Sequence, residues 1–390
     1  LGVVSFFLIM TLLFSSIYWA AQPLMELLDG AFSTVADRVI AFAPQSLWSD
    51  FIANGIIRSF SAVLIFVPQI FILFFGIGVL ESTGYLARAA TLIDRPLSHL
   101  GLSGRSFVPL LSGFACAVPA LMATRNISSR RDRMIAQLVI PLMTCSARLP
   151  VYALLIGFLF PENFLWAGLT LALLYFVSIV IGVLAAAVID RFLPKDNAGF
   201  FLMELPLYRR PRLKVLIKQS WTRTQSYITN AGPIIFVLAV VLLFGTQFPR
   251  HENAETRVRQ SYASQLGQVI EPVFTPMGVD WRVGFGLISA FAAREVFVSA
   301  MAIVFHAANE DEGTQQQALL KEMHEAHFSD GRKIFTVSSV LGLMVFFMIA
   351  LQCISTVATM QKESGGWKYA WGQLLALNLF AYVLTVALVQ

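Results

Sequence analysis

The sequence predicts an all-α fold, a polytopic α-helical membrane protein with an inverted internal repeat and broken helices. Hydrophobic residues make up 57% of the 390 residues and charged residues 13%, which is outside the range of soluble globular domains. The apolar residues gather into runs of about 20, the length that an α-helix needs to cross about 30 Å of hydrocarbon. Two of these regions are related by a single sequence offset, and both are interrupted near their middle.

Eight apolar runs are long enough to cross a membrane, and a ninth segment at 106–123 is shorter and broken. The first run has neither a basic n-region nor a small-residue cleavage site, so we do not interpret it as a signal peptide. The chain begins at Leu1 rather than at Met, and we expect its N-terminus to be a cut. The predicted spans lie at 3–21, 61–80, 134–160, 165–189, 223–246, 283–306, 337–358 and 369–389.

Basic loops between the runs predict the orientation. The loop 124–133 and the stretch 191–223 are rich in arginine and lysine, so both are expected in the cytoplasm. After Pro211, apolar residues alternate with cations at near-helical spacing, which favours an amphipathic helix at the membrane interface over a solvated basic loop. Topology explains the net charge of +5, and no basic stripe with interleaved aromatic residues supports nucleic-acid binding.

The stretch 307–333 is polar and contains His324 and His327. A His-x-x-His pair on a helix is able to bind a metal, but no further ligand pattern accompanies it, and we interpret the stretch as an exposed linker. If both repeat segments are hairpins, this stretch lies outside the cell. If 283–306 crosses once, it lies in the cytoplasm.

The internal repeat appears when the sequence is shifted by 177 residues, without a gap. Matches of glycine, arginine and serine are harder to obtain by chance in an apolar chain than matches of leucine or valine. Three spans separate the two copies, so the second copy is expected to be inverted, an architecture typical of transporters whose substrate site lies at midplane breaks. The matched pairs are Gly101 with Gly278, Arg105 with Arg282, Leu110 with Leu287, Ser112 with Ser289, Phe114 with Phe291, and Ala115 with Ala292.

Glycine and proline predict where the helices break. Gly113 and Pro119 interrupt the ninth segment, and Pro141 and Pro150 bracket Cys145 and Arg148 in the next run. Non-helical backbone at membrane depth is tolerated only where protein or a water-filled cavity surrounds it. The alternative is a pair of proline-kinked helices that only pack.

Ionisable residues inside apolar runs are further candidates. Arg294 and Glu295 lie in the middle of one run, where each costs roughly 2.5–3.5 kcal/mol on insertion scales and usually faces a cavity or a partner. A structural role, in which the pair is neutralised by other helices, is the alternative. Glu81 ends an earlier run, where a simple interface carboxylate is the plain interpretation.

Several motifs resemble the FeoB family, ferrous iron transport protein B. They are "GVLESTGYLARAATLIDRPL", "GFACAVPALMATR", "PLMTCSARLPVY", "FLMELPLYRRPRLK", "FAAREV", and "LQCIS" before "ESGGW". The resemblance implies a bacterial inner-membrane, multi-pass Fe²⁺ importer built from two gate-type repeats. It also implies a GTP-binding domain that uses GTP and Mg²⁺, small cytoplasmic Feo proteins as partners, and a possible homo-oligomer.

The chain departs from the family in two ways. Ala115 stands where the family usually has glycine, and nothing matches the phosphate-binding motif G-x-x-x-x-G-K-[ST]. We therefore expect no enzyme activity and no cofactor in this chain, with the N-terminal G domain preceding it in the complete protein. A naturally split protein is the alternative.

The candidate metal ligands follow from chemistry and from the resemblance together. Fe²⁺ accepts thiolate and carboxylate ligands, whereas Mg²⁺ and Ca²⁺ prefer oxygen, so cysteines at two helix breaks favour a transition metal. Unpaired backbone carbonyls at the breaks would replace water shed by the ion. Our candidates are Cys116 and Cys145 first, Glu295 and Glu81 second, and Met122 and Met143 in reserve, whereas Cys353 is treated only as a reduced thiol.

We predict that the chain moves Fe²⁺ into the cytoplasm as the membrane portion of a GTPase-linked importer. The alternatives are a gate-fold carrier of a small organic solute such as a nucleoside, and a non-transporting membrane anchor for a GTPase. The predicted parts are a first span with its connecting segment at 1–60, a first gate repeat at 61–160, a central helix with the amphipathic segment at 161–222, a second gate repeat at 223–306, and a polar loop with C-terminal spans at 307–390.

Overall fold

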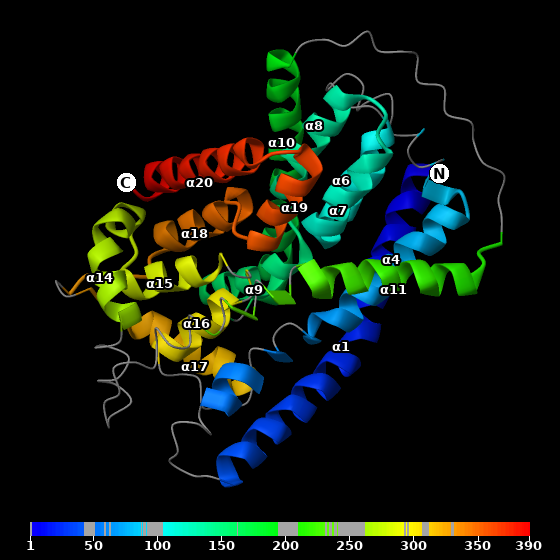
Figure 1. The fold of residues 1–390 in the computed structure, drawn as a ribbon. Helices are drawn as coiled ribbons and strands as arrows, with labels where there is room; N and C mark the ends of the chain where they lie inside the picture. The colour runs from blue at the N-terminus through cyan, green and yellow to red at the C-terminus, as the bar shows by residue number, and fades with distance from the viewer. Residues whose placement is uncertain are drawn as a thin grey trace. The chain divides into compact units, whose positions relative to one another are not determined.

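A computed structural model gives the fold as a set of helices (Figure 1). Within the described part of the chain the residues form helices and turns without a strand, apart from one isolated bridge between His327 and Lys333, which confirms the all-α prediction. The structure describes residues 2–42, 51–57, 60–61, 64–86, 88, 91, 104–161, 163–193, 210–230, 232–233, 236–237, 240, 262–291, 294, 296–305, 312–328 and 331–390.

Four helical stretches among the described residues are long and apolar enough to cross a membrane. In an apolar 18-residue window of Phe164–Phe192, and in one of Trp367–Val389, 17% of the residues are buried, as suits helices that face lipid. In the corresponding windows of Arg130–Leu159 and Val337–Ser364, 67% and 78% of the residues are buried, so these two stretches belong to the protein interior. Both interior stretches are broken helices, and the fold is that of a membrane protein with interrupted inner helices.

The structure divides into two compact units, and the first comprises residues 1–140 and 185–243. The predicted span 3–21 is the start of a helix that continues to residue 42 and contains Pro23. The helices of this unit are α1 (Gly2–Phe42), the π-helix η1 (Phe51–Ile57), α4 (Phe66–Ser82), η2 (Gly104–Ser106), α6 (Phe107–Ala115), α7 (Ala117–Ala123), η3 (Thr124–Asn126), α8 (Arg130–Val139) and α11 (Leu213–Asn230).

The basic segment after Pro211 forms a helix, as predicted, and the solvated-loop alternative is wrong. One face of α11 packs on α4, where Leu216 lies against Gly78. Ser220 and Thr224 continue this buried face at helical spacing. Lys214 and Lys218 are exposed, whereas Trp221 and Arg223 at the edge of the buried face still contact the Phe71 and Phe74 rings of α4, so the helix is amphipathic. It runs through residue 223, where we had placed the start of a separate span.

The break in the first repeat lies at Cys116, between α6 and α7. Cys116 has extended backbone with φ −158° and ψ 133°, and its amide still donates to the Ser112 carbonyl at 3.0 Å. Pro119 explains the position, because it lacks the amide that would bond the Ala115 carbonyl and its ring clashes with that carbonyl. Gly113, in contrast, lies inside α6 and is not the point of the break.

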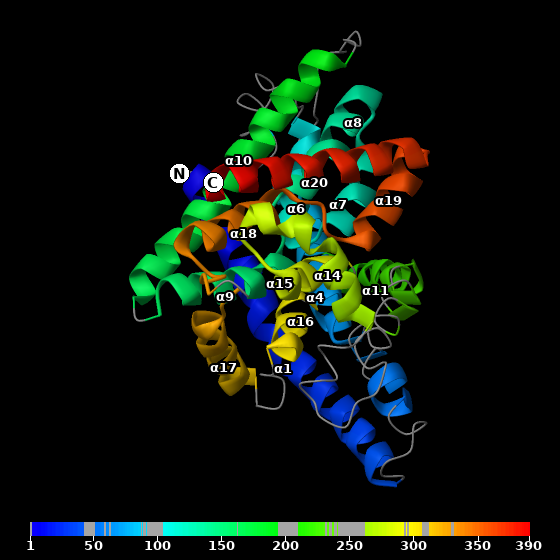
Figure 2. The same cartoon turned by 90° about the vertical axis from the view of Figure 1, so that its left-hand side faces the viewer.

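The second unit comprises residues 141–184 and 244–390. In both views α18 and α20 lie side by side (Figure 2), and the Thr385 hydroxyl of α20 donates to the Gly342 carbonyl of α18 at 3.1 Å. The helices are η4 (Ile140–Leu142, which starts in the first unit), η5 (Ser146–Arg148), α9 (Leu149–Leu159), α10 (Phe164–Phe192, which ends in the first unit), α14 (Tyr262–Phe274), η6 (Thr275–Met277), α15 (Trp281–Ser289), α16 (Val296–Val304), α17 (Glu312–Glu325), α18 (Val337–Ile349), α19 (Ile354–Ser364) and α20 (Trp367–Val389).

The second repeat segment is a helical hairpin. A side chain added at Gly286 of α15 would lie 3.0 Å from the Phe297 ring and 3.3 Å from the Met301 sulfur, both on α16. A continuous helix would separate residues 286 and 301 by about 22 Å. The segment 283–306 therefore folds back on itself in the way that a re-entrant hairpin requires. The side of the membrane on which residues 307–333 lie stays a prediction, as does the inverted relation of the two repeats.

The break between α8 and α9 spans residues 140–148. Its two 3₁₀ turns, η4 and η5, leave backbone groups that no helix satisfies. The hydroxyl of Ser178, which is fully buried on α10, accepts from the Thr144 amide at 3.1 Å and donates to the Leu142 carbonyl at 3.0 Å. A single side chain from α10 thus bonds one amide and one carbonyl of the break.

We expect that Ser178→Ala lowers the free energy of unfolding by about 1 kcal/mol, because it leaves a buried amide and a buried carbonyl without a partner. The matched control is Thr222→Ala on α11, where an exposed hydroxyl donates to the Lys218 carbonyl of its own helix. That change should stay within about 0.5 kcal/mol. Equilibrium unfolding in mixed micelles measures both variants, and equal effects would refute the role given to Ser178.

Candidate functional site

Each of the three cysteines begins a helix at a break. Cys116 precedes α7, Cys145 precedes η5 with φ −81° and ψ 162°, and Cys353 precedes α19 with φ −164° and ψ 105°. This position is normally taken by serine, threonine, aspartate or asparagine, whose oxygen bonds the first helical amides. None of the three thiols makes such a capping bond, and none is in a disulfide. The cysteines are therefore placed at breaks without serving as caps.

Cys116 lies in the first unit, at the edge of a small apolar cluster. It packs with Ile72 and Ile77 against the buried Leu73 of α4 and Ala115 of α6. Its thiol is partly exposed, so the extended residue is not sealed in a core. Cys145 belongs to the second unit.

Cys145 is buried and lies in the break between α8 and α9. Its carbonyl accepts from the Arg148 amide at 3.0 Å. Its sulfur accepts from a terminal guanidinium nitrogen of Arg294 at 3.4 Å, although the two residues are 149 positions apart in the sequence. The second repeat segment thus reaches the thiol that sequence analysis had placed in a different motif.

The break between α18 and α19 carries the third cysteine. Backbone from Ala350 to Cys353 is non-helical, and the Ile354 amide that follows donates to the Phe291 carbonyl at 3.1 Å. Gln352 is fully buried within this break, and both polar atoms of its side-chain amide have no hydrogen-bond partner in the described structure. A buried amide without partners costs free energy, so it marks a place where a polar or charged group is accommodated.

Arg294 connects these breaks. Its guanidinium is 5% exposed and donates to Cys145 Sγ, to the Gln352 carbonyl at 3.2 Å and to the Ala350 carbonyl at 3.4 Å. Arg294 itself lies in the turn between α15 and α16. Three interrupted segments of the second unit therefore meet at one guanidinium.

Arg148 has a more local role. It is fully buried, and its terminal nitrogens donate at 3.2 Å to the carbonyls of Pro141 and Met143 in its own break. We had expected carbonyls at the breaks to be unpaired and ready to replace water around an ion. That expectation is wrong for the carbonyls of Pro141, Met143, Ala350 and Gln352, because guanidinium groups already bond them.

The remaining candidates are placed as follows. Glu81 is exposed on the last turn of α4, about 12 Å along the helix from the Leu73 that contacts Cys116. The structure therefore does not bring Glu81 to a break. Glu295 lies outside the described residues. Met122 of α7 is partly buried, Met143 is buried, Pro141 lies in η4, and Pro150 starts α9 at an exposed position.

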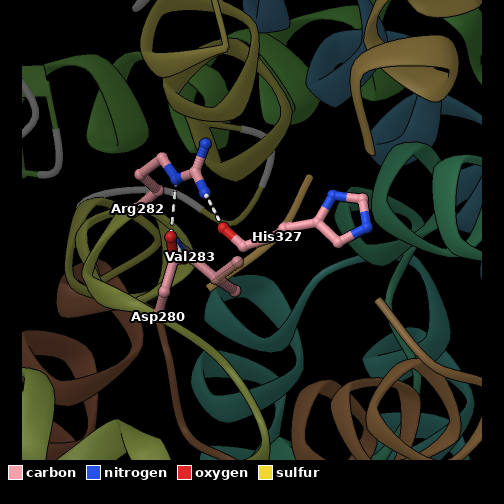
Figure 3. A network of polar contacts seen from close by, with 4 residues as sticks. All are labelled: Asp280, Arg282, Val283 and His327. Carbon is pink, nitrogen blue, oxygen red and sulfur yellow. Dashed lines mark hydrogen bonds and ion pairs between the residues drawn. The ribbon is translucent and has the colours of Figure 1, made fainter. Parts of the chain in front are cut away.

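The two histidines do not form a metal site in the part of the chain that is described. The His324 ring stacks on Phe158 with 4.1 Å between ring centroids. Figure 3 shows the His327 ring directed away from a polar cluster in which Arg282 bonds Asp280 at 2.5 Å and the His327 carbonyl at 3.2 Å. Arg282 also lies over the Phe305 ring at 4.8 Å, so this cluster fastens the segment after α17 to the start of α15.

Sequence reasoning missed three members of the site, namely Cys353, Gln352 and the bonding role of Arg148. A signal was present for two of them. Cys353 follows the same pattern as the other thiols, a cysteine inside an apolar run, and Arg148 is an arginine at membrane depth. Gln352 is a polar residue inside the predicted span 337–358 and in the motif "LQCIS", but its importance comes from burial without a partner, which the sequence does not show.

Two family models match the chain. The model described as "Nucleoside recognition", named Gate, matches residues 63–159 and 228–367, which is more than half of the chain. The model described as "Ferrous iron transport protein B C terminus" matches residues 171–223. The first match includes the breaks at Cys116, 140–148 and 350–353, and the second includes Ser178, which bonds one of them.

Curated relatives match nearly the whole chain. A protein named Fe(2+) transporter FeoB from Leptospira interrogans serovar copenhageni is 38% identical, over 99% of this chain and 56% of that protein. A protein of the same name from Staphylococcus aureus strain MSSA476 is 34% identical, over 100% of this chain and 57% of that protein. A protein named Fe(2+) transport protein A/Fe(2+) transporter FeoB fusion protein from Porphyromonas gingivalis is 34% identical, over 95% and 47%.

The chain spans about half the length of the curated relatives that it matches. The motifs in its sequence, its interrupted apolar helices and both family models indicate the same family. The chain therefore belongs to the FeoB family of ferrous iron transport proteins.

Proposed function

We propose that this chain forms the pathway through which Fe²⁺ enters the cytoplasm, as the membrane portion of a GTPase-linked importer. The observation that carries this proposal is the position of all three cysteines at helix breaks, where none of them caps a helix. The names of the relatives support Fe²⁺ as the substrate.

The ligand types fit a transition-metal ion. Thiolates select softer metals, whereas Mg²⁺ and Ca²⁺ prefer sites made of oxygen. Cys116 provides one thiol in the first unit, and Cys145 and Cys353 provide two in the second. We propose that Fe²⁺ passes these ligands in series. Glu81 and Glu295 remain second candidates, Glu81 as an exposed carboxylate at the end of α4.

The partners and the location follow from the same proposal. We propose that the protein is a multi-pass protein of the bacterial inner membrane, with an N-terminal G domain that binds GTP and Mg²⁺. A small Feo protein is proposed as a cytoplasmic partner, supported by the relative whose name describes a fusion of transport protein A with the transporter. A homo-oligomer is a further proposal, and no nucleic acid is expected.

A carrier of a small organic solute is the second candidate function, because the longer family match is described as nucleoside recognition. Competition distinguishes the two functions. Excess nucleoside should leave radioactive Fe²⁺ uptake unchanged if the chain carries iron. Saturable uptake of a nucleoside, with no Fe²⁺ uptake, would replace our proposal with the second candidate. Uptake of neither would favour the membrane anchor.

We predict that Cys116→Ser and Cys145→Ser each reduce Fe²⁺ uptake by about tenfold or more, the factor that corresponds to 1.4 kcal/mol. Serine keeps the size of the side chain and removes the soft ligand. The double variant should be little worse than either single one, because ions that pass ligands in series are stopped by the loss of one. Anaerobic uptake of radioactive Fe²⁺ into vesicles containing the full-length protein measures the effect.

The matched control is Met323→Leu, which removes a buried sulfur from α17, away from the breaks, at nearly constant volume. Its uptake should equal that of the unchanged protein, and all variants should be produced at similar levels. Full transport by the Cys116→Ser/Cys145→Ser variant would show that the thiols only pack. In that case the carboxylates would become the leading candidates.

We also predict that residues 1–390 alone neither bind nor hydrolyse GTP. The sequence has no glycine-rich loop followed by lysine and serine or threonine, so no backbone cradle for the phosphates is expected. Purified chain should give the same GTP turnover as an empty-membrane preparation, with the full-length protein as the positive control. Saturable GTPase activity in the purified chain would contradict this prediction.

A further inference from the structure

We propose that Arg294 is a displaceable internal cation, which occupies ligands of the second unit when iron is absent and must leave them when Fe²⁺ binds. The inference rests on the proposed function, since it concerns the same pathway. It assigns to Arg294 a positioning and gating role that neither the family matches nor the relatives' names contain.

The bonds of Arg294 define the set of atoms concerned. Its three guanidinium nitrogens donate to one sulfur, Cys145 Sγ, and to two carbonyl oxygens, those of Ala350 and Gln352. Thiolate sulfur and carbonyl oxygen are also the groups that a divalent transition metal takes from a protein. The guanidinium and an ion therefore compete for the same acceptors, and two buried cations side by side repel each other.

The geometry favours exchange over permanent anchoring. The distances from Arg294 to its two carbonyl acceptors are 3.2 and 3.4 Å, which is the long end of the N–H···O range. Arg294 lies in the turn of a hairpin and not within a helix, so a change in the turn moves the side chain without unwinding α15 or α16.

Gln352 supplies an independent observation at the same place. Its backbone carbonyl bonds Arg294, and its fully buried side chain has an amide oxygen and an amide nitrogen without partners. A buried oxygen without a donor is suited to a cation that is not yet bound. The break between α18 and α19 thus offers one occupied and one unoccupied acceptor from the same residue.

Arg148, in contrast to Arg294, is a structural arginine. Its bonds go to Pro141, Met143 and Thr144, all within seven residues, and none goes to a thiol. It therefore holds one break in shape. Arg294 bonds atoms 56 to 149 positions away, and it is the arginine whose departure would open a thiol and two carbonyls together.

The test is the affinity for Fe²⁺, because the sign of the change separates the two roles. Arg294→Gln removes the competing charge, so the dissociation constant for Fe²⁺ should fall by about tenfold or more, the factor equivalent to 1.4 kcal/mol. An arginine that only supports the fold would, when removed, leave binding unchanged or weaker. Anaerobic equilibrium dialysis with radioactive Fe²⁺, on the chain in lipid nanodiscs, measures the constant.

Two further variants complete the experiment. Arg282→Gln is the matched control, because Arg282 also bonds a side chain and a carbonyl, those of Asp280 and His327 (Figure 3), neither of which belongs to a break, and the affinity of this variant for Fe²⁺ should not change. Arg294→Lys keeps the positive charge on a group that lacks the planar fork, so it should bind Fe²⁺ more tightly than the unchanged chain by a smaller factor. If Arg294→Gln does not fold, the affinity of Arg294→Lys for Fe²⁺ tests the inference in its place.

The outcomes are distinct. Tighter binding in both Arg294 variants, with Arg282→Gln unchanged, supports the inference. Saturable binding by the unchanged chain, with equal or weaker binding in the folded Arg294 variants, overturns the inference and leaves the proposed function standing. Absence of saturable Fe²⁺ binding in the unchanged chain overturns the proposed function, and the inference fails with it.

Discussion

The hydrogen bonds of the Arg294 guanidinium are the interaction on which the second unit depends. A helix broken inside a membrane leaves backbone groups that water cannot reach, so other parts of the protein must satisfy them. Arg294 does this for the break after α18 and contacts the thiol in the break before α9. Arg148 and Ser178 bond backbone carbonyls of the break before α9. The interrupted helices are therefore held by a few buried polar side chains.

This arrangement meets two opposite requirements of a cation pathway. Without an ion, a set of inward-facing carbonyls and thiols would be costly to bury. With the guanidinium in place, the same acceptors are bonded and the structure remains packed. We propose that a protein that carries its own cation in this way is stable while empty, and that it opens the ligand set only to an ion that binds strongly enough to displace the arginine.

Sequence alone predicted the breaks at Cys116 and at 140–148, because proline acts locally, but not the break at 350–353, which lies inside the predicted span 337–358. Pro119 prevents α6 from continuing past Cys116, and Pro141 and Pro150 bracket the second interruption. The amphipathic α11 was predicted from its spacing for the same reason. The internal repeat also indicated a hairpin at α15 and α16, but the length of the run 283–306 allowed a single crossing of the membrane as well.

Several partners at the breaks were not predictable, because they come from distant parts of the chain. Arg294 and Cys145 are 149 residues apart, and no local pattern connects them. The expectation of unpaired carbonyls failed for this reason at Ala350 and Gln352, whose donor lies in another motif, whereas Arg148 bonds Pro141 and Met143 within its own motif. Glu81 was chosen for its charge at the end of an apolar run, yet that position is exposed. Charge near a membrane span does not by itself distinguish an interface residue from a ligand.

The most direct measurement is anomalous diffraction at the iron edge from crystals of the protein soaked anaerobically with Fe²⁺. Our account predicts an iron peak in the second unit, next to Cys145 Sγ and the carbonyls of Ala350 and Gln352, with the Arg294 side chain moved off these atoms. An ordered iron peak elsewhere in the protein, with Arg294 still bonded to Cys145, would contradict it.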